Sequence, residues 1–366
     1  MLRKAGSTVF GASAFFDKLE KDRDYGMRIA EKIGMTLPEY YTFGSITESL
    51  KWLQDRPSDE KWYFKTDREL GAAFTAGGDK AHLSARLKYV RASKGDRIKH
   101  LLQKAIDGAD LSTAFYWNGR TFLLPAEGTL ERKEFGESDT GPKTGCAMNL
   151  MWFYSDVPKV VHEQGWAKLI EIFRAEQAPP GIVDINAILG DDGKVYFLEW
   201  TPRLGIDAEP TAQRLLQIEY GEFISRLCDA TLPVAPFSTD NCAYSIRLSV
   251  PPYPYEPNKV DEKNSPIGLP CIEIQPGKSL WGRNVRDRLV AYGLQNVDGE
   301  IQCADPFGLL GIASAIGTNL DTMNDACVKY AKDLRIPDLG YRTDGAKMIR
   351  KDLAAVRATG HEAPTL

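Results

Sequence analysis

Two apolar segments joined by a short turn, at residues 181–200, constrain the fold more than any other part of the sequence. The segments 181–189 (GIVDINAIL) and 194–200 (KVYFLEW) both have the composition of a β-strand, and the stretch from Gly190 to Gly193 between them is typical of a turn. Strands joined by so short a turn pair antiparallel. We therefore predict a β-hairpin, which requires a β-sheet in this part of the chain.

Each strand of this hairpin carries an acidic side chain, Asp184 on the first and Glu199 near the end of the second. In an antiparallel pair such positions can face each other on one side of the sheet. Two adjacent carboxylates repel unless a cation lies between them, and Mg²⁺ prefers carboxylates together with substrate phosphates. Solvated strand-end charges are the commoner case, but the neighbours of both acids are apolar. We interpret the pair as a candidate metal site, with Asn186 as a further ligand or a hydrogen-bond donor.

Two basic residues lie near turns that suit a phosphate group. Arg203 follows the second strand in the segment TPRLG, and a planar guanidinium suits a phosphate or a carboxylate. Lys65 ends the apolar segment WYFK (62–65), next to a Gly-rich stretch. Neither residue is specific alone, because surface salt bridges and strand-end lysines are common.

The overall composition argues against several classes of protein. A chain of 366 residues is too long for one ordinary domain. The 46 basic and 50 acidic residues nearly balance, which argues against a large nucleic-acid-binding face and leaves a local basic groove open. The six cysteines form no CxxC pair, so we expect reduced thiols rather than disulfides or zinc. The sequence shows neither an apolar run of membrane-spanning length nor a secretory signal, so we expect a cytoplasmic protein.

The other periodicities predict a mixture of helices and strands. The Asn118-Gly119 turn within 112–125 predicts a second hairpin. The polar, Gly-rich stretch 128–148 is typical of a long functional loop. The segment 96–106 is apolar enough for a strand or a helix, and its periodicity does not decide between them. We further predict helices at 13–33, 46–54, 158–176, 208–228 and 320–334, and strands at 39–43, 62–65 and 307–317.

Four segments carry a resemblance to a known family. They are KTDRELG (65–71), DTGPKTG (139–145), DINAILGDDGKVYFLEWTPRLG (184–205) and YRTDG (341–345), in that order. With these motifs the chain resembles the ATP-grasp ligases, and among them the glycinamide ribonucleotide synthetases (phosphoribosylamine–glycine ligases). The DTGPxTG motif is the most specific of them, and the similarity extends from Val9 to about residue 349.

The resemblance implies an α+β chain with the ATP-grasp fold, in which two α+β subdomains clasp ATP, and a small C-terminal β-rich domain. Residues 36–110 would form the small (lid) subdomain and 111–235 the large subdomain with the metal site. Because the chain begins where the family's first domain is ending, most of that domain would be missing. The other divisions are then a domain remnant with a linker helix (1–35), the C-terminal domain (236–355) and a tail (356–366).

The resemblance also implies a role for each matching residue. Arg203 would contact the γ-phosphate or the acyl phosphate, and the loop 139–145 would close over the amino acid and the transferring phosphate. The bound groups would be ATP, with Lys65 at its α- and β-phosphates, and Mg²⁺ or Mn²⁺. The implied ATP contacts are Lys65, Gln103, Ala105, Ile106 and Asp110, the metal ligands are Asp184, Glu199 and Thr201, and the catalytic residues are Lys133, Thr144 and Arg203.

Several positions depart from the family's pattern. Thr201 stands where the family has an asparagine, and Gln103 where it has an adenine-facing glutamate. The G-K-G sequence of the family's lid is replaced by Ala72-Ala73-Phe74, which makes Lys80 the candidate substitute for its lysine. The family's stretch LPxAxSxDHKRxGD reads LPAEGTLERKEFGE here, at 124–137.

The implied reaction joins a carboxylate, such as an amino acid, to an amine through an acyl phosphate, as in purine biosynthesis. The partners would be small molecules, a membrane would have no part, and the enzyme would be a monomer or a homodimer. Two alternatives stay open: the amine could differ, for example a modified nucleotide, or the chain could bind ATP without catalysis. A third interpretation, an α+β protein whose hairpin acids are only surface charges, is disfavoured by the ordered motifs.

Overall fold

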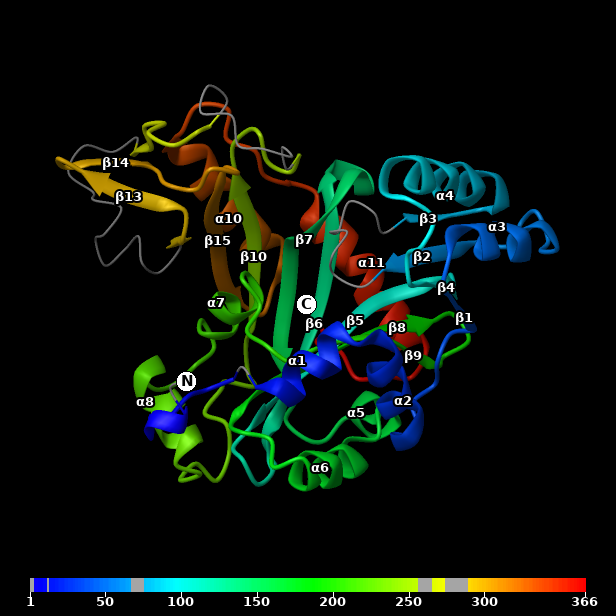
Figure 1. Ribbon diagram of the computed structural model, residues 1–366. Coiled ribbons are helices and arrows are strands. Elements are labelled where there is room, and N and C mark those ends of the chain that lie inside the picture. Colours follow the sequence, from blue (N-terminus) through cyan, green and yellow to red (C-terminus); the bar gives the residue numbers. More distant parts are fainter. Residues whose placement is uncertain (1–2, 12, 67–75, 256–264, 274–288) are drawn as a thin grey trace.

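Two antiparallel sheets dominate the computed structural model, which describes residues 3–11, 13–66, 76–255, 265–273 and 289–366. An eight-stranded sheet forms the centre of the molecule, and a four-stranded sheet with two helices lies beside it (Figure 1). Helices and antiparallel strands alternate along the chain, so the predicted α+β class is confirmed. Among the described residues, no helix is both long enough and apolar enough to cross a membrane.

The four-stranded sheet has the order β1-β4-β2-β3. Alternate side chains of β2 (Trp62–Thr66) are buried, so Trp62 and Phe64 pack under the helices while Tyr63 and Lys65 point to the other face. The undecided segment 96–106 is settled as a strand, because it pairs on both sides. The remaining elements are β1 (Tyr40–Phe43), β3 (Ala76–Gly78), β4 (His100–Lys104), α3 (Ile46–Gln54) and α4 (Lys80–Lys94).

The eight-stranded sheet contains both predicted hairpins, which are therefore confirmed. Its order is β12-β15-β10-β7-β6-β5-β8-β9. Because β10 pairs with β7, the sheet continues across the boundary predicted at residue 235, and the division into domains stays a prediction. The strands are β5 (Gly108–Trp117), β6 (Phe122–Gly136), β7 (Thr140–Phe153), β8 (Gly181–Gly190), β9 (Val195–Thr201), β10 (Cys242–Ser249), β12 (Leu289–Ala291) and β15 (Leu309–Gly317).

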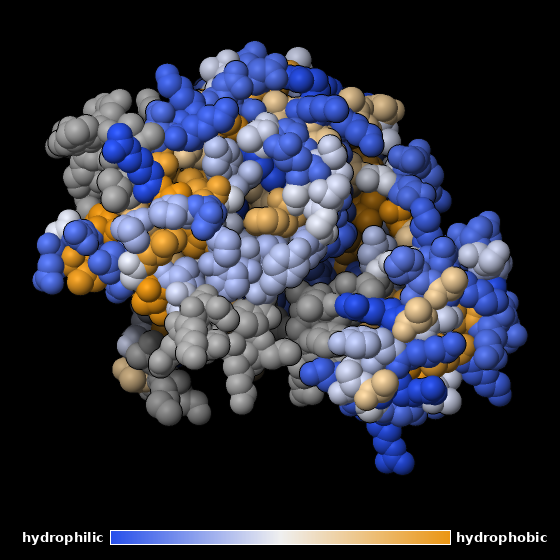
Figure 2. Space-filling model, turned by 90° about the horizontal axis from the view of Figure 1, so that it is seen from above, coloured by the Kyte–Doolittle hydropathy of each residue, from blue (hydrophilic) through white to orange (hydrophobic). Residues whose placement is uncertain are grey.

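The main hydrophobic core lies between the central sheet and its helices, among them α11 (Gly345–Ala358). Ile349 and Leu353 of α11 are buried in the same cluster as Leu111 of β5. Two short sheets, β13 (Leu294–Val297) with β14 (Glu300–Cys303) and β11 (Ile272–Glu273) with β16 (Leu334–Arg335), lie outside the central sheet. Figure 2 shows hydrophobic side chains gathering on the side that carries β13 and β14. The other helices are α1 (Ala14–Lys21), α2 (Arg23–Ile33), α5 (Lys159–Glu163), α6 (Trp166–Ala175), α7 (Ala208–Ala212), α8 (Tyr220–Cys228) and α10 (Leu320–Asp333).

Three predicted helices are each divided in two. The predicted helix 13–33 breaks at Asp22, whose extended backbone ends α1 and whose side chain accepts a 3.0 Å hydrogen bond from Tyr25 N to begin α2. The helix 158–176 breaks at Gly165, which has a left-handed backbone with φ of 66°. The helix 208–228 is interrupted because Gln217 N donates to Pro236 O at 2.8 Å and so joins another segment.

The loop predicted at 128–148 is wrong, because these residues belong to the long strands β6 and β7. Their polar and Gly-rich composition hid the strands, but their backbones pair along most of the hairpin. The register shifts between Arg132 and Glu134 and between Glu134 and Gly136, and the tip is the 3₁₀ turn Glu137–Asp139. Ser138 and Asp139 take left-handed backbones there, with φ of 56° and 57°. The segment 139–145 is therefore mostly strand rather than a closing loop.

Candidate active site

A cavity of about 640 Å³ lies where the two sheets meet, lined by residues from both. The strands β2 and β4 contribute Lys65 and Gln103, and the central sheet contributes the acids and most of the other polar groups. Ala105 is the one implied ATP contact that does not line this cavity, and its N–H donates to Lys61 O at 2.9 Å. The structure brings together Lys65, Gln103, Ile106, Asp110, Lys133, Thr144, Asp184, Glu199, Thr201 and Arg203.

Polar side chains line the cavity because alternate residues of each strand point to opposite faces of the sheet. Along β5, Leu111 is buried in the core with α11, whereas Asp110 and Ser112 face the cavity. In the hairpin β8–β9, Asp184 lies opposite Thr201, and Asn186 lies opposite Glu199. These four side chains therefore share one face of the sheet, and the two acids are diagonal neighbours rather than directly opposed.

Asn186 holds this group together through its side-chain amide. It donates to Asp184 Oδ2 at 2.9 Å and to Thr201 Oγ1 at 3.0 Å, and its own oxygen accepts from Ser112 Oγ at 3.2 Å. The other oxygen of Asp184, Oδ1, is buried and has no hydrogen-bond partner among the described residues. A buried carboxylate oxygen without a partner is suited to a cation, so the donor chemistry here fits Mg²⁺.

The electrostatics of Asp184 agree with this interpretation. Burial, with the nearby charge of Glu131, raises the pKa of Asp184 to about 8. The part of the chain that the structure describes contains no group of three or more His, Cys, Asp or Glu side chains placed to hold a metal ion. A metal bound by Asp184 and Glu199 would therefore need further oxygen ligands from a phosphate or from water.

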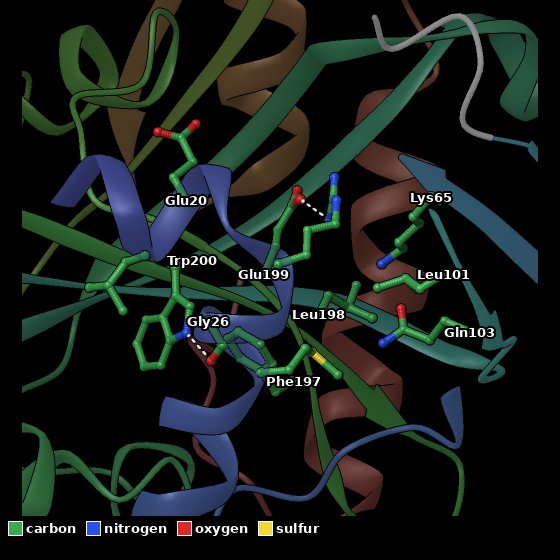
Figure 3. Close-up of a pocket in the computed structure, with 12 residues that line it drawn as sticks. Glu20, Gly26, Lys65, Leu101, Gln103, Phe197, Leu198, Glu199 and Trp200 are labelled. Carbon is green, nitrogen blue, oxygen red and sulfur yellow. Dashed lines mark hydrogen bonds and ion pairs between the residues drawn. The ribbon is translucent and has the colours of Figure 1, made fainter. Parts of the chain in front are cut away.

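Glu199 lies among cations. Arg23 Nη1 pairs with Glu199 Oε2 at 3.5 Å, and Arg23 Nε donates to Thr66 O at 2.9 Å, so this arginine connects α2, β2 and β9. Figure 3 shows that pair, with Lys65 and Gln103 reaching toward it from the smaller sheet. Burial alone would raise the pKa of Glu199, but Lys65 and Arg23 outweigh it and lower the pKa. Glu199 is therefore ionised next to a group of cations.

Two lysines face this cavity, and their pKa values shift in opposite directions. Burial lowers the pKa of Lys65 to about 8, and Arg23 and Lys133 add to that effect while Glu199 opposes it. Burial also acts against the charge of Lys133, but Asp110 and other carboxylates outweigh it and raise the pKa of Lys133. Both are positioned to neutralise phosphate charge, and Lys65 is the one whose charge depends on pH near neutrality.

Other predicted residues make contacts that the sequence did not indicate. Arg203 Nε pairs with Glu20 Oε1 at 2.9 Å, so its predicted phosphate contact stays a prediction. Thr144 Oγ1 donates to Lys133 O at 2.8 Å, which ties β7 to β6 next to the cavity. Lys80 does not line the cavity, because Nζ binds the carbonyls of Gln54 and Arg56. The lid stretch Ala72-Ala73-Phe74 lies outside the described residues.

The tip of the β6–β7 hairpin is anchored by a partly buried ion-pair network. Asp139 pairs with Arg132 at 2.7 Å and with Arg342 at 3.0 Å. Arg342 is 2% exposed and also donates to both oxygens of Asp344, at 2.9 and 2.8 Å. Arg132 also pairs with Asp352 of α11. The first residue of the DTGPKTG motif is thus held by its contacts to the C-terminal segment.

Sequence reasoning missed several cavity residues. Arg23 begins a helix whose pattern shows only amphipathicity, and no motif marks it. Arg247 of β10 has a side chain that is 9% exposed and pairs with Asp207, which also accepts a 2.5 Å bond from Tyr292. Glu127 and Glu209 also line the cavity and are 5% and 6% exposed. The sequence offered one signal for these residues, which was an acid such as Glu127 within a segment that forms a strand, because an acid that becomes buried needs a partner.

The chain was compared with known proteins by sequence. No family model matches the chain. A phosphoribosylamine–glycine ligase of Leptospira interrogans is 24% identical over 355 residues, which cover 92% of this chain and 76% of that protein. The corresponding ligase of Lactococcus lactis is 22% identical over 305 residues, covering 79% and 69%.

The solved structures decide the fold. The crystal structure of phosphoribosylamine–glycine ligase from Thermotoga maritima matches with a TM-score of 0.70 and 19% identity, over 92% of this chain and 81% of that one. The chain has the ATP-grasp fold. A biotin carboxylase domain of 2-oxoglutarate carboxylase from Hydrogenobacter thermophilus, in complex with MgADP, shares this ATP-grasp architecture with a TM-score of 0.62 and 11% identity, over 96% and 74%. The predicted ATP-grasp fold and the resemblance to phosphoribosylamine–glycine ligases are confirmed.

Proposed function

We propose that this protein is an ATP-dependent carboxylate–amine ligase of the phosphoribosylamine–glycine ligase type, which uses Mg²⁺. The relatives carry that name, and a structure with the same fold contains MgADP. The observation that carries the proposal is the cavity between the two sheets. It gathers Lys65 and Lys133 together with Asp184 and Glu199, and cations next to carboxylates are what a metal-bound triphosphate requires.

In the first step, a carboxylate oxygen of the substrate attacks the γ-phosphorus of ATP, and ADP leaves. Lys65, Lys133 and Arg203 are the cations available to neutralise the negative charge that develops on the phosphoryl oxygens. Asp184 and Glu199, with Thr201, would hold Mg²⁺, which would supply further charge neutralisation at the phosphates.

In the second step, the amine attacks the carbonyl carbon of the acyl phosphate, phosphate leaves, and the amine nitrogen loses a proton. The protein contributes mainly by positioning, because both reactions occur between bound substrates. Gln103, Ile106 and Asp110 line the cavity. In this proposal Gln103 and Ile106 would contact the adenine, and Asp110 would accept from the ribose hydroxyls. Enclosure between two sheets also protects the acyl phosphate from water.

The test is ADP release with glycine and phosphoribosylamine. We expect Glu199→Gln and Asp184→Asn each to reduce kcat/KM by a factor on the order of 100 or more, because each removes a charge from the metal site. Asp192→Asn is the matched control, because Asp192 is a solvent-exposed acid at the turn of the same hairpin and its contacts are with Lys194 and Tyr196. Unchanged turnover in both site variants would show that the metal assignment is wrong.

A second candidate is a ligase of the same chemistry with a different amine. Glu127 favours it, since the family's stretch has an alanine at this position and this chain places a buried carboxylate in the cavity. Complementation of a purine auxotroph that lacks phosphoribosylamine–glycine ligase separates the two candidates. Growth supports the first, whereas ADP release with another amine but no growth supports the second.

A further inference from the structure

Arg203, one of the cations proposed for the phosphates, is held by an acid from the N-terminal part of the chain. Its Nε donates to Glu20 Oε1 of α1 at 2.9 Å, and this is its one side-chain hydrogen bond among the described residues. The Glu20 side chain is 14% exposed. Glu20 lines a small pocket together with Lys65 and Glu199, and in Figure 3 its carboxylate extends to the same side as that of Glu199. The contact therefore borders the candidate site.

The contact leaves most donors of the guanidinium available. A guanidinium has five N–H donors, one on Nε and two on each Nη. Glu20 accepts from Nε. Arg203 lines the main cavity and Glu20 does not, so the acid contacts the guanidinium from outside the cavity. The two Nη groups form a second edge, which can donate to two oxygens of one phosphoryl group.

The helix that carries Glu20 is packed closely against β9. Leu19 is buried in the main core, and Trp200 Nε1 of β9 donates to Gly26 O of α2 at 2.8 Å. A Cβ at Gly26 would lie 2.8 Å from Leu19 O and 3.0 Å from Trp200 Cδ1, so α1, α2 and β9 are in close contact. Arg203 itself follows β9 outside any helix or strand. A partner on a packed helix can fix a loop side chain that would otherwise sample many rotamers.

We propose that Glu20 is a positioning residue, which orients Arg203 so that its Nη groups meet the γ-phosphoryl group during transfer. The inference rests on the proposed function for the contact between Arg203 and that phosphoryl group. It makes α1 part of the active site, whereas the resemblance implied only a domain remnant with a linker helix at 1–35. A misplaced cation loses much of its effect in the transition state, where geometry and charge must match together.

The test is a double-mutant cycle between Glu20 and Arg203, with binding measured by calorimetry. The probes are MgADP and the magnesium complex of the β,γ-imido analogue of ATP, because only the analogue carries a γ-phosphoryl group. We expect Glu20→Ala and Arg203→Met each to weaken binding of the analogue by about tenfold and to leave MgADP binding unchanged. The double variant should bind no more weakly than Arg203→Met, since Glu20 acts through that arginine.

Two further variants separate positioning from a structural role. Glu20→Gln keeps an oxygen acceptor and the shape of the side chain, so it should recover most of the affinity for the analogue. Asp17→Asn is the control, because Asp17 pairs with Lys21 on the exposed side of the same helix. Glu20→Ala should remain folded, because alanine is the best helix former, and its MgADP binding checks this.

Losses that add in the double variant would overturn the proposal, and so would unchanged binding of the analogue in Glu20→Ala or in Arg203→Met. An equal loss for MgADP and the analogue would also overturn it, because this is the result of a structural role. In turnover with glycine and phosphoribosylamine, Glu20→Ala should lower kcat about tenfold with little change in KM. Coupled losses in binding, without ADP release from these substrates, would refute the ligase proposal and leave the role of Glu20 in place.

Discussion

We predict that the charge of Lys65 makes nucleotide binding depend on pH. Its pKa is lowered to about 8, mainly by burial, so the ammonium is present below pH 8 and is lost as the pH rises through that value. If this charge binds phosphate, the Kd for MgATP should increase about tenfold between pH 7 and pH 9, because little of the charged form is left at the higher pH. Calorimetric titrations at several pH values measure this.

Lys65→Arg is the control for that prediction, because a guanidinium stays charged across the whole range. The arginine variant should bind MgATP with little dependence on pH. Curves of the same shape for the wild-type protein and Lys65→Arg would mean that another group is responsible. Lys133 would not produce the effect, since neighbouring carboxylates such as Asp110 raise its pKa and keep it charged.

At the scale of single elements, the junction of α5 and α6 depends on one glycine. Gly165 has φ of 66°, and a Cβ at this position would lie 2.5 Å from Ile33 O of α2. Gly165→Ala should therefore lower the free energy of unfolding by about 2 kcal/mol or more, through backbone strain and the steric conflict with α2. Urea denaturation measures the change.

The matched control is Gly221→Ala, near the start of α8. A Cβ there would meet no atom within 4 Å, and its backbone is helical. This variant should be neutral or stabilising by up to about 1 kcal/mol, because alanine is the better helix former. An equal loss of stability in both variants would show that the left-handed backbone of Gly165 is not what divides the predicted helix 158–176.

The elements that the sequence predicted correctly are those with local signals. Asn118-Gly119 marked one hairpin and the stretch Gly190 to Gly193 the other, and α3 has the bounds predicted for the helix at 46–54. The strands β6 and β7 were missed because their distal halves are polar, and their pairing depends on each other rather than on side-chain pattern. Asp22 and Gly165 divide helices through backbone geometry that periodicity does not report.

At the scale of the whole molecule, the candidate site is assembled from distant segments. Motif order located Lys65, Asp184 and Glu199, which the fold brings to one cavity. The sequence could not place Arg23 there, since its contact with Glu199 arises only when α2 packs between the two sheets. The tertiary structure also brings Glu127 of β6 and Glu209 of α7 to this cavity from different elements.

Arg342 connects the tip of the β6–β7 hairpin to the C-terminal segment. It is buried, and it bridges Asp139 at the hairpin tip to Asp344 before α11. Arg342→Met should lower the free energy of unfolding by about 3 kcal/mol or more, because Asp344 loses the guanidinium that donates to both of its oxygens, and Asp139 keeps Arg132 but loses its second arginine. Arg350→Met, which breaks the exposed pair with Asp321, should cost less than about 1 kcal/mol. Similar losses measured by urea denaturation would contradict the proposed anchoring.

The pairing of β7 with β10 has a consequence during synthesis on the ribosome. Strands β5 to β9 emerge before β10, so β7 has no neighbour on its outer side until β10 is made. An unpaired strand edge invites association with other chains. A nascent chain interrupted between residues 201 and 242 would present that edge together with half-built binding elements. Pairing with β10 covers this edge of β7, so the C-terminal segment protects the nascent chain from such association.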